Sequence, residues 1–272
     1  MKNQIINNDL KIFTKKFNKF FKTKLGKDKN LLNKAMLYSI NSGGKRFRPY
    51  LVYTFGKELN LSNNLIFNLA AIIEMLHNYS LVHDDLPSMD NDKFRRGKKT
   101  THYKYNEYIA ILAGCALLTK SYQILSSKAL RLSDKKKIKL IDTISKVSGE
   151  KGLLLGQYHD LSIQSPSISD RIRVNKLKTA RLMSYCCQAV AICAGKNKNI
   201  ENNFKKAGQY IGEIFQINDD FVDFPQMPKQ DAEKLLEYKK ILVDKIHQIF
   251  HVLKLRRKKT FLLIDFVKDL KV

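Results

Sequence analysis

The chain has 272 residues, of which 44% are hydrophobic, and a formal net charge of +25 at pH 7. Its length and apolar content allow a sizeable core, and because no Pro/Gly/Ser-rich linker divides it we expect a single domain over residues 1–272. The lysines are scattered along the whole chain, which argues against a nucleic acid or an anionic membrane as the functional partner.

Prolines and glycines are sparse, five and twelve in all, and this predicts long helices. Apolar residues recur at helical spacing in three stretches, near residues 69–76, 109–116 and 211–215, and no useful alternating strand pattern is found. We therefore expect an all-α bundle of about ten helices. The expected breaks lie near Gly43–Gly44, Pro87, Gly97, Ser165–Pro166, Gly195 and Pro225–Pro228.

The first segment with a chemical signature is S42-G-G-K-R-F-R-P49. Paired glycines let a backbone approach a ligand closely, while Lys45 and Arg48 offer positive charge to a phosphate group. By itself such a segment is commonly an ordinary loop. Whether this segment binds a phosphate group depends on the other motifs of the chain.

Four aspartates lie at and just beyond the end of the next predicted helix, which ends near Pro87, in D84-D-L-P-S-M-D-N-D92. His77 and Asp84 are seven residues apart, so they lie on one stripe of that helix. Asp90 comes after Pro87, where the chain can turn back. Arg95 and Arg96 then provide planar guanidinium groups that suit phosphate oxygens.

A second acidic cluster occurs in Q216-I-N-D-D-F-V-D223, where Asp219 and Asp223 are four residues apart and Gln216 precedes them by one turn. Closely packed carboxylates repel each other unless a cation lies between them, and Mg²⁺ held by carboxylates and substrate phosphates is the natural candidate. A solvated acidic face is the alternative for either cluster alone. Two clusters on apolar helices favour the metal, with the clusters facing each other across the bundle.

Taken together, these motifs resemble those of the trans-polyprenyl diphosphate synthases, and most closely those of bacterial-type farnesyl diphosphate synthases. The resemblance runs from about residue 30 to residue 224. It is carried by G43-G-K-R-F-R-P49, D84-D-L-P-S-M-D90, R95-R-G97, G156-Q-Y-H-D160, L177-K-T179 and F215-Q-I-N-D-D-F-V-D223. It implies an all-α, isoprenoid-synthase-type bundle around a central cavity that works as a homodimer on isoprenoid diphosphates.

The resemblance also implies a role for each motif residue. Two or three Mg²⁺ ions would bind Asp84, Asp90 and Asp219, supported by Asp85, Asp220 and Asp223. The allylic diphosphate would contact Arg95, Lys178, Thr179 and Gln216. Isopentenyl diphosphate would contact Lys45, Arg48, His77 and Arg96.

The reaction expected from this resemblance joins isopentenyl diphosphate to dimethylallyl and then geranyl diphosphate, giving farnesyl diphosphate. Metal ions and cationic side chains would stabilise the departing diphosphate, and the apolar helices would exclude water. Tyr79, five residues before Asp84, would limit product length, since its ring lies about 7.5 Å along the helix axis from Asp84. A geranyl or geranylgeranyl product is the alternative.

The chain departs from the family pattern after Asp223. The usual loop carries a lysine that touches the allylic diphosphate, and here F224-P-Q-M-P-K229 leads directly into a predicted helix. Lys229 is a candidate substitute, and Cys115 and Leu155 are milder departures. A degenerate, weakly active subunit of the same fold is therefore a second hypothesis. An RNA-binding protein using K254-L-R-R-K-K259, expected on a solvated helix face, is a third.

The expected location is the cytoplasm. The four cysteines form no C-x-x-C pair and are expected to be small buried residues of a reduced protein. The first residues contain no continuous apolar segment of the signal-peptide kind. The longest apolar run, from Tyr108 to Leu118, is too short to span a bilayer, so no membrane span is expected.

Overall fold

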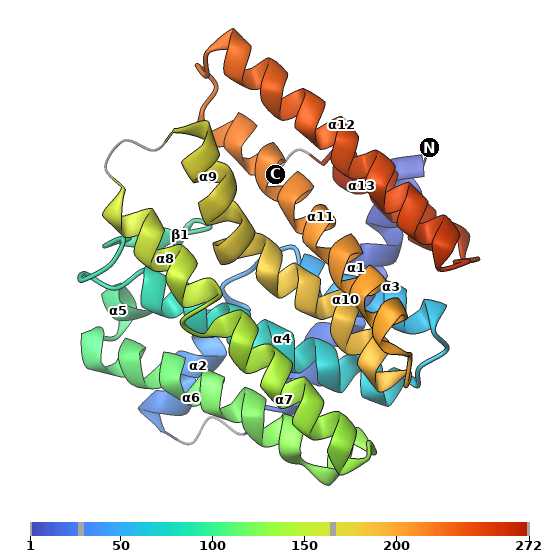
Figure 1. The fold of residues 1–272 in the computed structure, drawn as a ribbon. Coiled ribbons are helices and arrows are strands. Elements are labelled where there is room, and N and C mark those ends of the chain that lie inside the picture. The colour runs from blue at the N-terminus through green and yellow to red at the C-terminus, as the bar shows by residue number, and fades with distance from the viewer. Residues whose placement is uncertain (1, 27–29, 164–166, 271–272) are drawn as a thin grey trace. The chain divides into compact units, whose positions relative to one another are not determined.

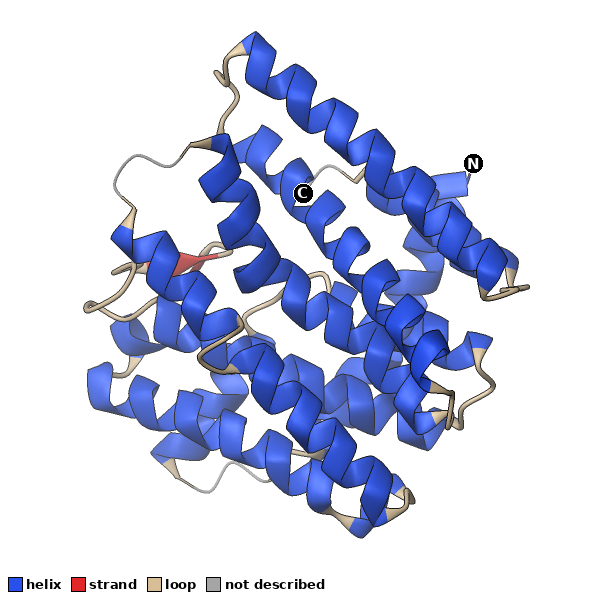
Figure 2. Ribbon diagram, viewed as in Figure 1, coloured by secondary structure: helices blue, strands red, loops and turns tan. Residues whose placement is uncertain are grey.

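The computed structural model describes residues 2–26, 30–163 and 167–270 and is built almost entirely of helices (Figures 1 and 2). The residues form two compact units. Unit 1 comprises Met1–Asp9, Thr54–Ser62 and Ile138–Val272, and unit 2 comprises Leu10–Tyr53 and Asn63–Lys137. Across the described ranges there are thirteen α-helices, which confirms the all-α prediction and exceeds the expected number of helices.

Unit 2 is organised around one buried helix. Its elements are most of α1 (Lys2–Thr23), α2 (Leu31–Asn41), the start of α3 (Phe47–Glu58), α4 (Asn63–Asp84), β1 (Phe94–Arg95), β2 (Lys98–Lys99), α5 (Thr101–Lys104), α6 (Glu107–Ser126), a 3₁₀ turn (Lys128–Leu130) and the start of α7 (Asp134–Ser148). Helix α4 is buried along most of its length, because apolar residues occupy nearly all of its faces. It packs mainly against α6.

Two local features fix the packing in unit 2. Gly114 of α6 lies against α4, where a Cβ atom would stand 2.3 Å from Nε2 of His83. Only glycine therefore permits this close approach of the two helices. On α1, Phe13, Phe17 and Phe21 recur at four-residue spacing and stack in sequence, with ring centroids 5.5 Å and 5.1 Å apart.

Unit 1 contains the remaining helices. They are the rest of α7, then α8 (Leu153–Ser162), α9 (Ile168–Asn175), a π-helical segment η2 (Lys176–Ala180), α10 (Arg181–Cys193), α11 (Lys198–Asp223), α12 (Lys229–Val252) and α13 (Lys258–Lys268). Helices α10 and α11 lie side by side (Figure 1). Gly208 of α11 allows this contact, since a Cβ on it would stand 2.5 Å from the carbonyl oxygen of Met183 on α10. Gly212 allows α11 to approach η2, where a Cβ would stand 2.6 Å from Cα of Ala180.

Most of the predicted breaks are confirmed. Helices end or begin around Gly43–Gly44, Pro87, Gly195 and Pro225–Pro228, whereas the break at Ser165–Pro166 lies outside the described residues. Gly97 lies in the turn of a short β-hairpin rather than between two helices. The segment K254-L-R-R257 forms an exposed turn between α12 and α13, so the prediction that the whole basic run lies on a helix face was wrong.

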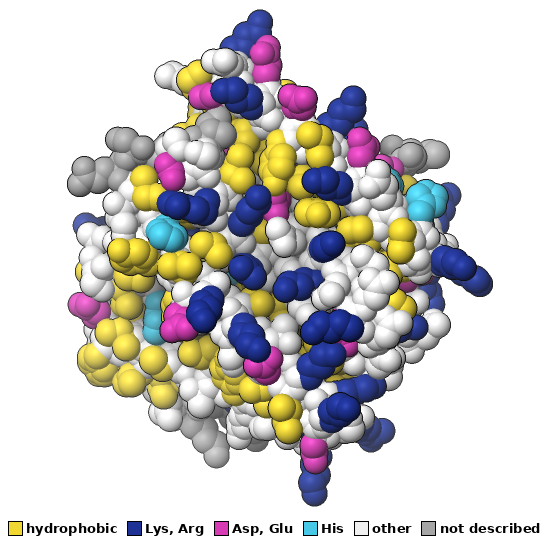
Figure 3. All heavy atoms as spheres, in the orientation of Figure 1, with side chains coloured by type: hydrophobic (Ala, Val, Ile, Leu, Met, Phe, Trp, Pro, Cys, Tyr) yellow, Lys and Arg dark blue, Asp and Glu magenta, His cyan; other side chains and the backbone are white. Residues whose placement is uncertain are grey.

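The distribution of basic side chains matches the expectation from the sequence, whereas the burial of the cysteines matches it only in part. Lysine and arginine side chains are spread over the face drawn in Figure 3, among apolar and acidic ones. Cys186, Cys187 and Cys193 are buried on α10, but Cys115 is exposed on α6, contrary to the expectation for all four cysteines.

Within the part of the chain that the structure describes, two helices, α4 and α6, are long and apolar enough to cross a membrane by length and composition. The apolar stretch of α4 is 83% buried and that of α6 is 44% buried. Helix α6 is longer than the apolar run from Tyr108 to Leu118 on which the sequence-based expectation rested. Buried core helices of a soluble protein have the same length and composition, and α4 fits that description.

Candidate active site

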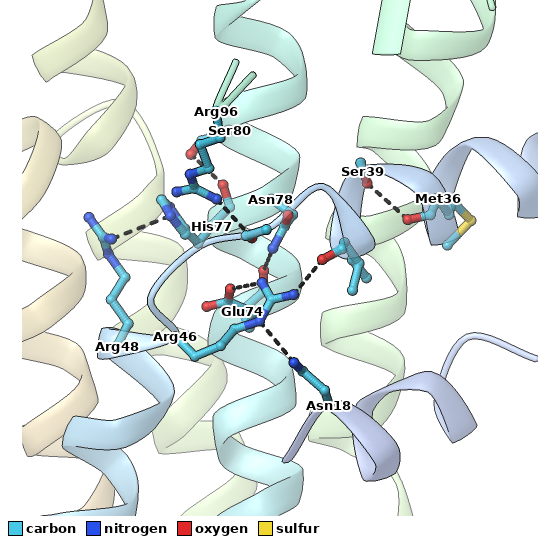
Figure 4. Close-up of polar contacts among 12 residues, drawn as sticks. Asn18, Met36, Ser39, Arg46, Arg48, Glu74, His77, Asn78, Ser80 and Arg96 are labelled. Atoms are coloured by element: carbon cyan, nitrogen blue, oxygen red, sulfur yellow. Dashed lines mark hydrogen bonds and ion pairs between the residues drawn. The ribbon is translucent and has the colours of Figure 1, made fainter. Parts of the chain in front are cut away.

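In unit 2, the glycine-rich basic loop is held by a buried arginine (Figure 4). Arg46 has a left-handed backbone with φ of 52°, and its guanidinium points into the unit. NH1 forms an ion pair with Oε1 of Glu74 at 2.5 Å, Nε donates to Oδ1 of Asn18 at 3.0 Å, and NH2 donates to the carbonyl of Ile40. Both side chains of the ion pair are buried, so the pair anchors the loop to Glu74 of α4.

Three of the four residues predicted to bind isopentenyl diphosphate are brought together by this loop (Figure 4). NH1 of Arg48 lies 3.3 Å from Nε2 of His77, and NH1 of Arg96 donates to the carbonyl of Gly43 at 2.9 Å. A Cβ on Gly44 would stand 2.4 Å from NH1 of Arg96, so this glycine is what allows the arginine to cross the loop. The fourth residue, Lys45, is exposed on the same loop.

The electrostatics of this cluster favour an anion. Burial lowers the pKa of His77 well below its usual value, and the charges of Arg48 and Arg96 lower it further. The pKa of Arg96 is lowered for the same first reason, burial, although a guanidinium stays protonated at neutral pH. The cluster therefore presents two guanidinium cations beside a neutral imidazole.

The first aspartate cluster turns back on itself, as predicted. The backbone N–H of Asp90 donates to the carbonyl of Asp84 at 2.9 Å, which closes a loop around Pro87. Asp84 and Asp85 are buried and Asp90 is exposed. The loop thus places the first and last carboxylates of the motif at the same end of α4.

The adjacent arginines, Arg95 and Arg96, lie in different parts of a short β-hairpin. Arg95 is in strand β1, where its backbone lies opposite that of Lys98 in β2. Arg96 and Gly97 form the two-residue turn, with φ of 54° and 73°. Nε of Arg95 contacts Oδ1 of Asp85 at 2.6 Å, and its NH2 contacts Asp92 at 3.2 Å. Arg96 reaches the glycine-rich loop instead, so neighbouring arginines serve different clusters.

The carboxylate of Asp85 therefore forms an ion pair with Arg95. Burial raises the pKa of Asp85, and the contact with Arg95 opposes that rise. A carboxylate held in this way steadies Arg95 beside the aspartate loop. The role predicted for Asp85 in support of a metal stays a prediction.

Tyr79 lies on α4, buried one turn before His83, and the two rings meet edge to face with centroids 4.8 Å apart. Burial raises the pKa of the Tyr79 phenol, and the nearby Cys115 raises it further. Nε2 of His83 contacts the carbonyl of Ile111 on α6 at 3.1 Å. The predicted length-limiting residue is therefore held in the packing between α4 and α6.

In unit 1, three of the four predicted allylic-site residues line a cavity of about 240 Å³ between α8, α9, η2 and α11, whereas the fourth, Arg95, belongs to unit 2. Oγ1 of Thr179 donates to Oε1 of Gln216 at 2.9 Å, and Nζ of Lys178 pairs with Asp160 at 2.6 Å. The structure thus brings Lys178, Thr179 and Gln216 together as expected. The cavity is lined by His159, Asp160, Ile163, Arg171, Val174, Asn175, Lys178, Thr179, Gln216, Asp220 and Phe224.

Asp220 is held in place by two amide side chains. Nδ2 of Asn175 donates to its Oδ2 at 2.9 Å, and Nε2 of Gln216 lies 3.3 Å from its Oδ1. Its neighbour Asp219 is partly buried, one step around the same helix. The role predicted for Asp220 in support of a metal stays a prediction. The side chain of Asp223, the last carboxylate of the motif, lies outside the described part of the chain.

The π-helical segment positions Lys178 and Thr179. Wider helical turns of this kind recur at functional sites, because they change the direction of side chains within a helix. Gly156 of α8 packs directly on η2, where a Cβ would stand 2.5 Å from the backbone nitrogen of Lys178. The glycine of the G156-Q-Y-H-D160 motif is thereby explained by close packing.

Sequence reasoning gave no role to Asp160 and Asn175, two of the polar residues of this cavity. Asp160 pairs with Lys178, and Asn175 holds Asp220. The motif ending at Asp160 was a usable signal, since an aspartate one turn from an active-site glycine is a plausible partner for a nearby lysine. No pattern marked Asn175, because its role depends on the path of η2.

The carboxylates fit Mg²⁺ by their chemistry. Among the described residues, no three His, Cys, Asp or Glu side chains are arranged to hold a metal ion by themselves. Mg²⁺ does not require such a cage, since it is usually bound by one or two carboxylates together with waters and phosphate oxygens. The predicted metal ligands are Asp84 and Asp90 in unit 2 and Asp219 in unit 1.

A polyprenyl synthetase family model matches residues 29–237. Among curated relatives, a farnesyl diphosphate synthase of Bacillus subtilis is 34% identical over 80% of this chain and 72% of its own length. One from Buchnera aphidicola is 35% identical over 88% of this chain and 87% of its own length. A geranylgeranyl diphosphate synthase of Cyanophora paradoxa is 36% identical over 70% of this chain and 64% of its own length.

Solved structures give the same result. The apo structure of an FPP/GFPP synthase from Zymomonas mobilis has a TM-score of 0.88 and 29% identity, covering 99% of this chain and 100% of that one. A geranyltranstransferase from Thermotoga maritima has a TM-score of 0.80 and 29% identity, covering 97% of both chains.

Proposed function

This chain belongs to the polyprenyl synthetase family, and from that premise we propose that it is a prenyltransferase that makes farnesyl diphosphate. It would condense isopentenyl diphosphate with dimethylallyl and then geranyl diphosphate. The observation that carries this proposal is the presence of two different anion-binding environments. One, around Arg48, His77 and Arg96, is basic, and the other contains carboxylates suited to a divalent metal.

Isopentenyl diphosphate is assigned to the basic cluster of unit 2. Lys45, Arg48 and Arg96 supply positive charge, and arginine forks match phosphate oxygens in two-point contacts. His77 is neutral at physiological pH, so its ring can hydrogen-bond without adding a further desolvated charge. The buried ion pair between Arg46 and Glu74 holds this loop in shape before the substrate arrives.

The allylic diphosphate is assigned to Arg95, Lys178, Thr179 and Gln216. Divalent metal use is general in this family, and the finer proposal is two or three Mg²⁺ ions on Asp84, Asp90 and Asp219. When bound, Mg²⁺ would neutralise negative charge that develops on the diphosphate leaving group.

The protein side chains orient the diphosphate and keep water away from the reacting carbon. Lys178 and Arg95 add charge-assisted hydrogen bonds to oxygens that become more negative as the C–O bond breaks. The double bond of isopentenyl diphosphate then attacks the allylic carbon, and the proton that is lost goes to the released diphosphate. In this proposal, exclusion of water is assigned to the apolar residues of α4 and of α11, the helices that carry the two aspartate motifs.

We assign a fifteen-carbon product because Tyr79 is a bulky, fixed ring on the helix that carries the first aspartate motif. A geranyl or geranylgeranyl product remains the alternative, and one similar protein is named for the latter. A degenerate, weakly active subunit is a further alternative because the usual loop lysine after Asp223 is missing. Retention of the basic cluster and of both aspartate motifs argues against degeneracy.

We also propose that the two units work as one domain within a homodimer in the cytoplasm. Helix α6 presents an apolar surface of Tyr108, Ile111 and Leu112, which are 60%, 40% and 48% exposed. Covering this surface with a second copy would remove it from water. Three buried cysteines on α10 suit a reducing compartment.

The test is a product analysis. Purified protein is incubated with Mg²⁺, dimethylallyl diphosphate and labelled isopentenyl diphosphate, and the chain length of the product is measured. A fifteen-carbon product is expected. Absence of condensation would favour the degenerate subunit, and ten- or twenty-carbon products would remove the role given to Tyr79.

A further inference from the structure

The cavity in unit 1 contains an arginine to which no motif assigns a role. Arg171 lies in the first turn of α9, and the centre of its guanidinium stands 3.9 Å from the centroid of the Phe224 ring. Both residues line the cavity. The backbone at Phe224 is fixed, because its N–H donates to the carbonyl of Asp220 at 3.0 Å and so caps α11.

Some charged side chains of the cavity already have ion-pair or hydrogen-bond partners within the protein, and Arg171 differs from them. The ammonium of Lys178 is paired with Asp160 at 2.6 Å, and the carboxylate of Asp220 is held by Asn175 and Gln216. Arg171 makes no ion pair with any residue that the structure describes. A guanidinium has five N–H donors, and an aromatic ring beside it does not use them all, so Arg171 can still donate hydrogen bonds to an anion.

We propose that Arg171, stacked on Phe224, binds oxygens of the allylic diphosphate and replaces the missing loop lysine. This inference rests on the proposed function and adds a specific anion contact to the same site. The stacking holds the long side chain in one orientation, which lowers the entropy lost when a diphosphate binds. The contact would be specific to the allylic substrate, because Arg171 lines the cavity that contains Lys178, Thr179 and Gln216.

Lys229, the substitute considered from sequence, is less suitable. Its side chain is 92% exposed, and its ammonium lies 4.0 Å from Glu233, one turn further along α12. It is not among the residues that line the cavity. A cation so fully solvated contributes little to a specific contact.

The test compares Arg171→Gln with Arg173→Gln. Arg173 is on the same helix, is 56% exposed and pairs with Asp170 at 3.3 Å, so it controls for loss of charge on α9. Michaelis constants are measured separately for geranyl and isopentenyl diphosphate. Arg171→Gln is expected to raise KM for geranyl diphosphate about tenfold or more and to leave that for isopentenyl diphosphate within about twofold. Arg173→Gln is expected to change neither.

Two further variants separate charge from stacking. Arg171→Lys keeps the charge without the planar group and should show an intermediate KM for geranyl diphosphate, as should Phe224→Leu. Lys229→Gln should behave as wild type. The proposal is overturned if Arg171→Gln leaves KM for geranyl diphosphate within twofold, if it weakens both substrates equally, or if Lys229→Gln produces the larger loss.

A binding measurement keeps this inference distinct from the overall function. Calorimetric titration of inorganic diphosphate with Mg²⁺ gives a dissociation constant that does not depend on turnover. If wild-type protein makes no prenyl product, the proposed function fails, but a weaker diphosphate affinity in Arg171→Gln than in Arg173→Gln still supports the anion contact. Equal affinities in the two variants, or no diphosphate binding by wild-type protein, would overturn it. Circular dichroism and melting temperature verify that each variant folds.

Discussion

His77 is surrounded by positive charge on the basic side of the proposed substrate site. Burial, Arg48 and Arg96 lower its pKa below the usual value of 6.5, in that order. The sequence placed His77 on the stripe of Asp84, but its proximity to two arginines depends on the path of the glycine-rich loop. A protonated ring here would add a third cation to a crowded site, so the neutral form is favoured.

The first prediction concerns the titration of His77. Because the folded-state pKa is depressed, the unfolded chain binds the additional proton first as pH falls. The contribution to stability is therefore full above about pH 6.5 and decreases as pH falls from there toward the folded-state pKa. An NMR titration of the His77 ring should give a pKa below 6.5, and a value at or above 6.5 would contradict this electrostatic picture.

The second prediction concerns the ion pair between Arg46 and Glu74. Glu74→Gln leaves the Arg46 charge buried without its carboxylate, which costs about 3–5 kcal/mol of unfolding free energy. It should also raise KM for isopentenyl diphosphate, since the loop that carries Lys45 and leads into Arg48 of α3 loses its support. Urea denaturation measures the first effect. The control is Asp142→Asn, which breaks an exposed pair with Lys146 and should cost less than about 1 kcal/mol; similar losses in both variants would refute the prediction.

At the level of elements, helical periodicity predicted the long helices well, because each long helix buries a continuous apolar face. It did not predict the hairpin at Phe94–Lys99, whose two-residue strands are too short to show alternation, nor the π-helical segment at Lys176–Ala180. The segment η2 packs against α8 and α11, and such tertiary contacts are not visible in the periodicity of the sequence. In the sequence, the contact with α8 is marked only by Gly156, which leaves room for the backbone of Lys178.

The third prediction tests the contact between α8 and η2. Gly156→Ala places a methyl group 2.5 Å from the Lys178 nitrogen, so the two elements must separate. We expect a stability loss of about 1–3 kcal/mol and a fall in kcat, because Lys178 and Thr179 shift with η2. Thermal unfolding and steady-state kinetics measure both effects. Ser162→Ala at the exposed end of α8 is the control, and wild-type kinetics in Gly156→Ala would refute the role given to η2.

At the scale of the whole molecule, the sequence predicted the motif residues and much of their grouping, but not all of their contacts. Arg48, His77 and Arg96 were expected together and are, as are Lys178, Thr179 and Gln216. Asp160, Asn175 and the orientation of Arg171 depend on tertiary packing that periodicity does not report. That the two aspartate motifs face each other is still a prediction.

The fourth prediction concerns assembly through α6. Leu112→Glu places a charge on the exposed apolar face of this helix and should convert the proposed homodimer into monomers. Sedimentation velocity measures the change. Glu107→Gln, at the start of the same helix, is the matched control and should leave the dimer intact. A monomeric wild-type protein, or a Leu112→Glu dimer, would contradict the proposal.

The cooperation of the two aspartate motifs is tested most directly by binding of a non-ionisable allylic diphosphate analogue. Its affinity is measured by calorimetry with and without Mg²⁺, for wild-type protein, Asp84→Asn and Asp219→Asn. If both motifs share the metal ions, wild-type binding depends on Mg²⁺, and each single substitution weakens the Mg²⁺-dependent affinity by about tenfold or more. Affinity that is independent of Mg²⁺, or unchanged in either variant, would contradict a shared metal site.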